Sequence, residues 1–174
     1  MGSKTQRLVI MSLLVSMAII LHVVETWIPL PFVVPGAKLG LANVVALYTL
    51  SVWGLRSALT VSWLRAVLGS LVAGTFGTFA FILSLGGALV STLVMGLVHR
   101  WGQQRFSLVG VSVVGAITHN LTQLLLVVWL LRQVGIMLLL PHMILLAVPT
   151  GIFTGLVVMK VRGLLGRHLH KWLA

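Results

Sequence analysis

The sequence predicts an all-α membrane protein, a polytopic bundle of six transmembrane helices with both ends in the cytoplasm. Of its 174 residues, 59% are hydrophobic and only 7% are charged, whereas about 25% of a typical soluble domain is charged. The apolar residues form long runs close to the ~20 residues that cross a bilayer, and the basic residues stand at the edges of these runs. Six spans use nearly the whole length, so we expect a single integral membrane domain over residues 1–174.

The apolar runs are separated by short connections rich in proline, glycine or charge. The first run, 8–28, ends at a connection that Pro29, Pro31 and Pro35 interrupt, because proline lacks the amide donor and clashes with a preceding helical turn. The second run, 39–54, is short for a span, so five or seven spans remain open alternatives. The other expected helices are 57–74, 76–98, 107–131 and 136–159.

Charge placement tests the number of spans, because cytoplasmic loops carry an excess of Lys and Arg. With six spans, only Lys38 and Arg132 fall on one side. The asymmetry predicts that the other side, with both termini, is cytoplasmic. The nine basic residues there are Lys4, Arg7, Arg56, Arg100, Arg105, Lys160, Arg162, Arg167 and Lys171.

The net charge of +11 does not indicate a nucleic-acid partner. The basic residues stand singly or in pairs beside apolar runs, where they meet anionic membrane lipid, and no soluble basic face or reading motif accompanies them. Cysteine is absent, which excludes thiolate metal sites. Because His168 and His170 lack a carboxylate or cysteine to complete a site, we expect no metal and no cofactor.

Spaced small residues predict where helices approach closely, since lipid gives no hydrophobic drive between helices. Ser12 and Ser16 form one such pair in the first helix, and Gly151 and Gly155 form another in the last. Packing inside the bundle explains these pairs, and an interface with a partner protein is the alternative.

Polar residues at membrane depth are the informative ones, because each must face the bundle interior, a partner group or water. Arg65 lies about eight residues, ~12 Å, into a helix that starts inside, which puts it near the midplane. Two roles are open for it. Arg65 contacts a ligand, or it has a structural role and bridges helix carbonyls or pairs with Glu25, the only acidic residue of the chain.

The fifth expected helix carries a polar stripe. Ser112, Ala116, His119 and Gln123 recur at i, i+4, i+7 and i+11 on one face, and Asn120 lies beside it. Ligand binding and interhelical hydrogen bonding, worth about 1 kcal/mol or less per group in a membrane, are equally open explanations.

Four more polar residues fall at the outer level of the expected helices: Glu25, Lys38, Asn43 and His142. Taken singly, Glu25 and Lys38 are also explained as interfacial residues whose charges snorkel to water. Together with the deeper polar residues, this group predicts an outward-facing pocket for a small polar or anionic molecule.

Trp27 and Phe32 are candidate aromatic covers for this pocket. The predicted substrate-binding residues are Lys38, Asn43, Arg65, His119, Asn120, Gln123 and Glu25.

Several short motifs resemble one known family. The run from Pro35 to Asn43, PGAKLGLAN, resembles the hallmark of the Gx transporter family, also called heptaprenyl diphosphate synthase component I. The resemblance extends over nearly the entire chain. The further matching segments are Arg65, Gly74-Thr75-Phe76, Ser84-Leu85-Gly86-Gly87, Val94-Met95 and the run GAITHNLTQ from Gly115 to Gln123.

This resemblance implies a fold like that of the S components of energy-coupling factor (ECF) transporters. S components capture vitamins and similar small molecules from the outer face of the bacterial cytoplasmic (inner) membrane. In vitamin S components, a small-residue pattern on the first helix packs against the coupling subunit, and Ser12 and Ser16 stand where that patch would be. The expected alanines are absent, so an ECF-type coupling subunit and another membrane or enzyme partner both remain open.

The synthase name has its own physical test. Prenyl chain elongation needs clustered aspartates that hold magnesium on the diphosphate, and this chain has no aspartate. We therefore expect that it is not an enzyme. The main hypothesis is a membrane protein that captures or transports a small polar or anionic molecule, such as a vitamin, a cofactor or an isoprenoid-related compound. The alternative is a non-catalytic membrane subunit that anchors or regulates a partner such as a prenyl diphosphate synthase.

Overall fold

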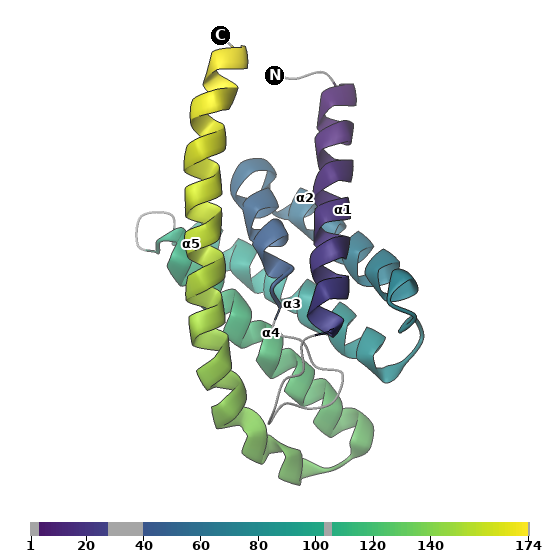
Figure 1. Cartoon of the computed structure of the whole chain (residues 1–174). Coiled ribbons are helices and arrows are strands. Elements are labelled where there is room, and N and C mark those ends of the chain that lie inside the picture. Colours follow the sequence, from purple (N-terminus) through teal and green to yellow (C-terminus); the bar gives the residue numbers. More distant parts are fainter. Residues whose placement is uncertain (1–3, 28–39, 103–105, 174) are drawn as a thin grey trace.

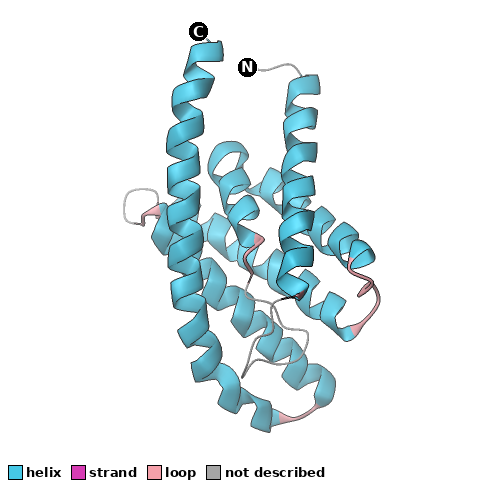
Figure 2. Cartoon of the chain, in the orientation of Figure 1, coloured by secondary structure: helices cyan, strands magenta, loops and turns pink. Residues whose placement is uncertain are grey.

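The computed structural model describes residues 4–27, 40–102 and 106–173, with side chains as far as residue 164. Every regular element in these ranges is a helix (Figures 1 and 2). Its five long helices are all long and apolar enough to cross a membrane, which confirms an all-α, multi-pass membrane protein. In order, the elements are α1 (Lys4–Thr26), α2 (Asn43–Val72), α3 (Phe79–Trp101), α4 (Leu108–Leu131), the 3-10 helix η1 (Val134–Leu139) and α5 (Leu140–Leu173).

Five long helices, rather than the expected six, form in the described part of the chain. The two ranges expected as the second and third spans belong to one element, α2, and its interruption falls at the expected boundary. Gly54 there has φ 79° and ψ −178°, a region of backbone conformation that is essentially restricted to glycine. Figure 1 shows that α2 changes direction sharply along its course. The expected proline-rich connection at 29–35 lies outside the described residues.

Consecutive helices pack against each other along the chain, and α2 also packs against α5 and, over a smaller area, against α4. Within the described residues, α1 packs against α2 alone. The outer face of α1 therefore carries large exposed apolar side chains, among them Leu8, Leu13 and Ile20. Such an exposed apolar surface is unfavourable in water. This uncovered face of α1 is therefore suited to contact with lipid.

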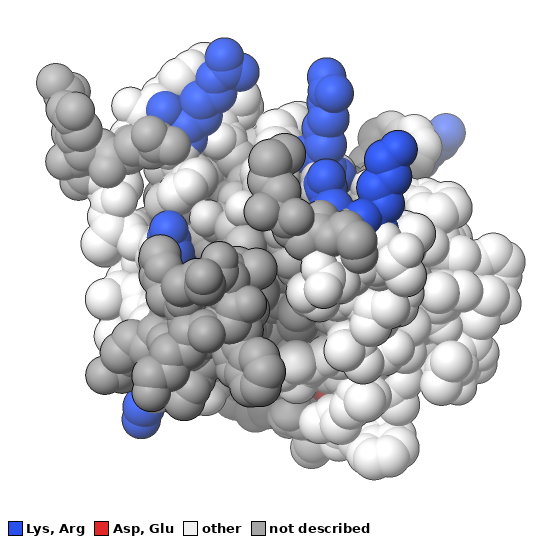
Figure 3. Space-filling view, turned by 90° about the horizontal axis from the view of Figure 1, so that it is seen from above, with Lys and Arg blue, Asp and Glu red and all other residues white. Residues whose placement is uncertain are grey.

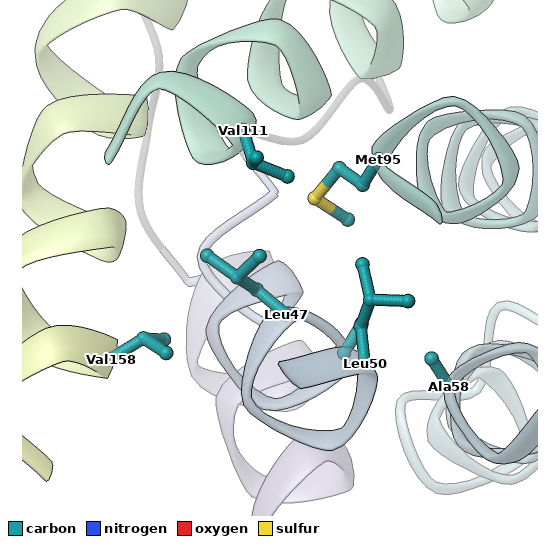
Figure 4. Packing of buried hydrophobic residues seen from close by; sticks show 7 residues of the cluster. Leu47, Leu50, Ala58, Met95, Val111 and Val158 are labelled. Atoms are coloured by element: carbon teal, nitrogen blue, oxygen red, sulfur yellow. The ribbon is translucent and has the colours of Figure 1, made fainter. Parts of the chain in front are cut away.

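The first half of α2 lies at the centre of the bundle. Leu47 and Leu50 point from it toward Met95 of α3 and Val111 of α4, and Val158 of α5 closes the cluster (Figure 4). All five side chains are almost fully buried. Four of the long helices thus meet around residues 43–53, which positions the start of α2 inside the protein.

Helix α5 packs on α4 through its two spaced glycines, as the sequence predicts. A Cβ atom added at Gly151 would lie 2.6 Å from the Cα of Val113, and one added at Gly155 would lie 2.6 Å from the Cα of Val109. Real Cβ atoms essentially never approach another atom this closely. The pair therefore permits direct backbone contact inside the bundle, which favours the internal-packing explanation for these two residues.

The first turn of α1 and the last turn of α5 lie at the same end of the molecule (Figure 1). Seen from that end, Lys and Arg side chains gather over the surface (Figure 3).

Candidate functional site

Arg65 is the centre of a buried polar cluster. It lies in the second half of α2, is only 2% exposed and donates from Nη2 to the Oδ1 atom of Asn43 at 3.3 Å. Asn43 is the first residue of α2 and is also buried. The carboxylate of Glu25, at the end of α1, acts electrostatically on the Arg65 guanidinium. Three segments that are separated in sequence therefore place one cation, one anion and one amide together.

Glu25 is turned into the protein rather than toward water. Its side chain is 3% exposed, and its Oε1 atom accepts hydrogen bonds from the backbone N–H groups of Gly40 and Leu41, the latter at 3.0 Å. Backbone N–H groups ahead of a helix have no partner within the helix and readily bind an anion. The snorkelling explanation is thus wrong for Glu25, which instead fastens the entrance of α2 to the last turn of α1.

His119 of α4 joins this cluster through two glycines. The ring is 1% exposed, and a Cβ atom added at Gly40 would lie 3.3 Å from its Cδ2 atom and 2.7 Å from Nδ2 of Asn43. On the opposite edge, a Cβ atom added at Gly87 of α3 would lie 2.9 Å from Cε1 of His119. Gly40, with φ +81°, therefore brings His119 next to the Asn43 and Arg65 pair.

Gln123 is fully buried one turn beyond His119, and their Nε2 atoms are hydrogen-bonded at 3.1 Å. An amide nitrogen can only donate. The His119 ring therefore accepts this hydrogen bond when its Nε2 atom is unprotonated. This contact fixes the orientation of the imidazole within the cluster.

Other members of the α4 stripe bond to α5. Asn120 donates from Nδ2 to the carbonyl oxygen of Met143 at 2.9 Å, and the hydroxyl groups of Ser112 and Thr154 lie 2.5 Å apart. Interhelical hydrogen bonding therefore accounts for Ser112 and for one side of Asn120, whereas His119 and Gln123 face α3 and the start of α2.

Three polar atoms of the cluster are buried without a hydrogen-bond partner among the described residues: Nε of Arg65, Nδ2 of Asn43 and Oδ1 of Asn120. A buried donor or acceptor without a partner costs about 1 to 3 kcal/mol. Two of the three are donors on the same hydrogen-bonded pair, so the cluster offers N–H groups to an additional acceptor.

The cluster is closed in this structure, because each of its side chains is buried. Two grooves lie at other places on the described part of the molecule. One has a volume of about 480 Å³ and lies between α2 and α3, and the other, of about 860 Å³, lies between α1 and α2. Neither is lined by the cluster residues, so the outward-facing pocket stays a prediction.

Other predicted residues lie apart from the cluster. Trp27 is 76% exposed and His142 is exposed, so neither covers the cluster. Lys38 and Phe32 lie outside the described residues, as do the side chains of His168 and His170. Ser12 and Ser16 are exposed on α1, where the Ser16 hydroxyl donates to the Ser12 carbonyl at 3.0 Å.

Sequence reasoning missed three contributors to the cluster and its surroundings: Gly40, Gly87 and His22. His22 is fully buried and packs on α2, where a Cβ atom added at Gly69 would lie 2.8 Å from its ring. His22 and Glu25 are three residues apart on one helix and so share a face, and this spacing could have identified His22 from the sequence. No group of three or more metal-binding side chains occurs within the described ranges.

The comparisons with known proteins give one positive result. A family model described as heptaprenyl diphosphate synthase component I matches residues 14–161, a range that contains every described residue of the cluster. No curated protein and no solved structure matches the chain.

Proposed function

The chain belongs to the heptaprenyl diphosphate synthase component I family, and we propose that this multi-pass membrane protein captures and transports a small polar or anionic molecule. The binding residues in this proposal are Glu25, Asn43, Arg65, His119, Asn120 and Gln123, together with Lys38, which lies outside the described part of the structure.

The observation that carries the proposal is the buried, hydrogen-bonded pair of Arg65 and Asn43, whose Nε and Nδ2 donors have no partner among the described residues. Ionisable residues are rare inside transmembrane segments and usually mark substrate or ion pathways. An oxygen of a carboxylate, a phosphate or a carbonyl group would accept from both donors and relieve their burial cost of about 1 to 3 kcal/mol each. A purely structural Arg65 would leave these donors without a partner.

The side of entry follows from the proposed topology. We assign the two halves of α2 to separate spans, because Gly54 breaks the helix and the described ends of the chain lie at one end of the molecule. This gives six crossings, and the basic end faces the cytoplasm of a bacterium by the positive-inside rule. Glu25, Gly40 and Asn43 are then on the outer side. Entry of a ligand from outside requires Gly40 and Leu41 to move away from the Glu25 carboxylate.

The resemblance to ECF S components supports the same proposal, since those proteins capture small molecules from the outer face. In this proposal, the exposed Ser12 and Ser16 are available to an ECF-type coupling subunit. The absence of the expected alanines leaves another membrane partner as the alternative at this patch.

A thermal-shift screen in detergent tests ligand binding. Purified protein is heated with inorganic phosphate, pyrophosphate and a set of water-soluble vitamins, each at a range of concentrations. A ligand at 100 times its Kd stabilises the folded protein by about 2.7 kcal/mol. We expect one compound class to raise the melting temperature of the wild type and of Arg100→Gln, an exposed control. The same compound should leave Arg65→Gln and His119→Ala unshifted, and equal shifts in all four proteins would refute the site.

The family description supports a second candidate function, that of a non-catalytic membrane subunit. A component of a prenyl diphosphate synthase would need a partner to supply the magnesium-binding aspartates, because this chain has none. Affinity purification from native membranes separates the two candidates. A stoichiometric synthase in the eluate, with no small molecule bound to the membrane chain, would favour the subunit over the transporter.

A further inference from the structure

The groove of about 860 Å³ between α1 and the second half of α2 has a basic end and an apolar body. Lys4, Arg7 and Arg56 line its basic end, and residues such as Met11 and Leu64 line the remainder. The groove is thus amphipathic along its length.

The groove is somewhat longer than the hydrocarbon part of one membrane leaflet. Its lining covers residues 4–19 of α1 and 56–68 of α2, which at 1.5 Å per residue are about 23 Å and 18 Å of helix. One leaflet contributes about 15 Å of hydrocarbon, half of the ~30 Å core. The side of the groove is open, because the lining residue Leu8 is 68% exposed. Surrounding lipid can therefore enter it laterally.

The three cations line the same end of the groove, and no acidic residue lines it with them. Arg7 reaches across from α1 and donates from Nη2 to Oγ of Ser57 at 3.0 Å, directly beside Arg56. The first turn of α1 contains no acidic residue, and the positive end of the helix dipole adds to the charge of Lys4 and Arg7. Such like charges repel one another unless an anion lies between them.

The only acidic side chain of the protein is too distant to supply that anion. Glu25 lies 18 positions beyond Arg7, about 27 Å along α1, whereas charges are screened within about 8 Å at physiological ionic strength. No acidic side chain of the protein therefore supplies the counter-charge.

We propose that this groove binds one anionic phospholipid of the adjacent leaflet. The phosphate accepts hydrogen bonds from the Arg7 and Arg56 guanidinium groups, whose forked geometry matches phosphate oxygens, and Lys4 adds a third charge. The hydroxyl groups of Ser57 and Thr60 lie next along the groove, at the level of the ester groups. An acyl chain then follows the apolar stretch. This site is separate from the Arg65 cluster and does not depend on its ligand. It includes Ser12 and Ser16, so a coupling subunit that docked on these residues would displace the lipid.

Native mass spectrometry of protein exchanged into mixed phosphatidylglycerol and phosphatidylcholine micelles tests the proposal. We expect wild-type protein to retain one phosphatidylglycerol in preference to phosphatidylcholine. A surface cation contributes about 1 kcal/mol toward anionic lipid, a factor of about five. Lys4→Gln, Arg7→Gln and Arg56→Gln combined should therefore lower retention roughly a hundredfold. An equal loss in the matched triple Arg100→Gln, Lys160→Gln and Arg162→Gln, which removes three charges outside the groove, would overturn the site.

A second pair of variants tests the apolar body without changing charge. Ser16 lines the groove, whereas its neighbour Met17 is exposed outside it. Ser16→Trp should lower lipid retention by filling the groove, and Met17→Trp should retain phosphatidylglycerol as the wild type does. Equal retention in both would overturn the proposal, as would displacement of phosphatidylglycerol by an equimolar polyprenyl diphosphate.

Discussion

Gly87→Ala and Gly86→Ala form a matched pair that tests whether the cluster around His119 is rigid. A Cβ atom at Gly87 would lie 2.9 Å from Cε1 and 3.0 Å from Nδ1 of His119, and 3.2 Å from Cγ of Gln123. Ordinary contact begins at 3.4 Å, so the ring would have to retreat by 3.4 − 2.9 = 0.5 Å. Since Gln123 holds the ring and is itself pressed by the same atom, α3 and α4 must separate. Overpacking of this kind costs about 1 to 3 kcal/mol.

Gly86→Ala supplies the control from the adjacent position. Its Cβ atom would lie 2.5 Å from Cδ1 of Leu126, but that atom is the tip of a flexible side chain that can rotate away. We expect Gly87→Ala to melt about 2 to 12 °C below the wild type in detergent, at about 2 to 4 °C per kcal/mol for a chain of this size. Gly86→Ala should melt within about 3 °C of the wild type. Equal lowering by both substitutions would refute the rigid contact.

Three further predictions concern stability and are measured by the same thermal unfolding in detergent. Gly151→Ala should lower the free energy of unfolding by about 1 to 3 kcal/mol, because its Cβ atom meets the backbone of α4. The control Gly163→Ala, whose Cβ atom would meet open space, should leave the free energy of unfolding unchanged. Gly54→Ala should cost about 1 to 3 kcal/mol, because alanine is strained at φ 79° and ψ −178°, and an unchanged stability would contradict the observed break. Glu25→Gln should cost about 1.5 to 3 kcal/mol, because it weakens the charge-assisted hydrogen bonds from Gly40 and Leu41 and removes the negative charge that acts on Arg65. Adding Arg65→Gln should recover part of this loss, so simple additivity of the two would argue against their coupling.

Much of the fold follows from the sequence because long apolar runs and their polar ends are local features. The spans after Gly74 are close to the observed α3 and α4, and the spaced glycines of α5 pack inside the bundle as expected. The boundary within α2 was harder to predict from the sequence. Only one residue, Gly54, leaves the helical conformation there, and Leu55 and Arg56 continue the helix at once, so the boundary is a kink rather than a loop.

The burial of the candidate site was predictable, but its connections were not. Depth arguments identified Arg65, His119 and Gln123, because a polar side chain within an apolar run must turn inward. The roles of Gly40 and Gly87 depend on which helices become neighbours, and a residue without a side chain gives no sign of this in the sequence. The bond from Asn120 to the Met143 carbonyl likewise joins residues that only the tertiary fold brings together.

The central claim is that the buried Arg65 cluster binds a small polar or anionic molecule, and native mass spectrometry of protein purified without added ligand tests it most directly. We expect wild-type protein and Arg100→Gln to carry the same bound small molecule, whose mass identifies its chemical class. Arg65→Gln should remain folded and lose that molecule. A folded Arg65→Gln protein with the same bound mass as the wild type would contradict the claim.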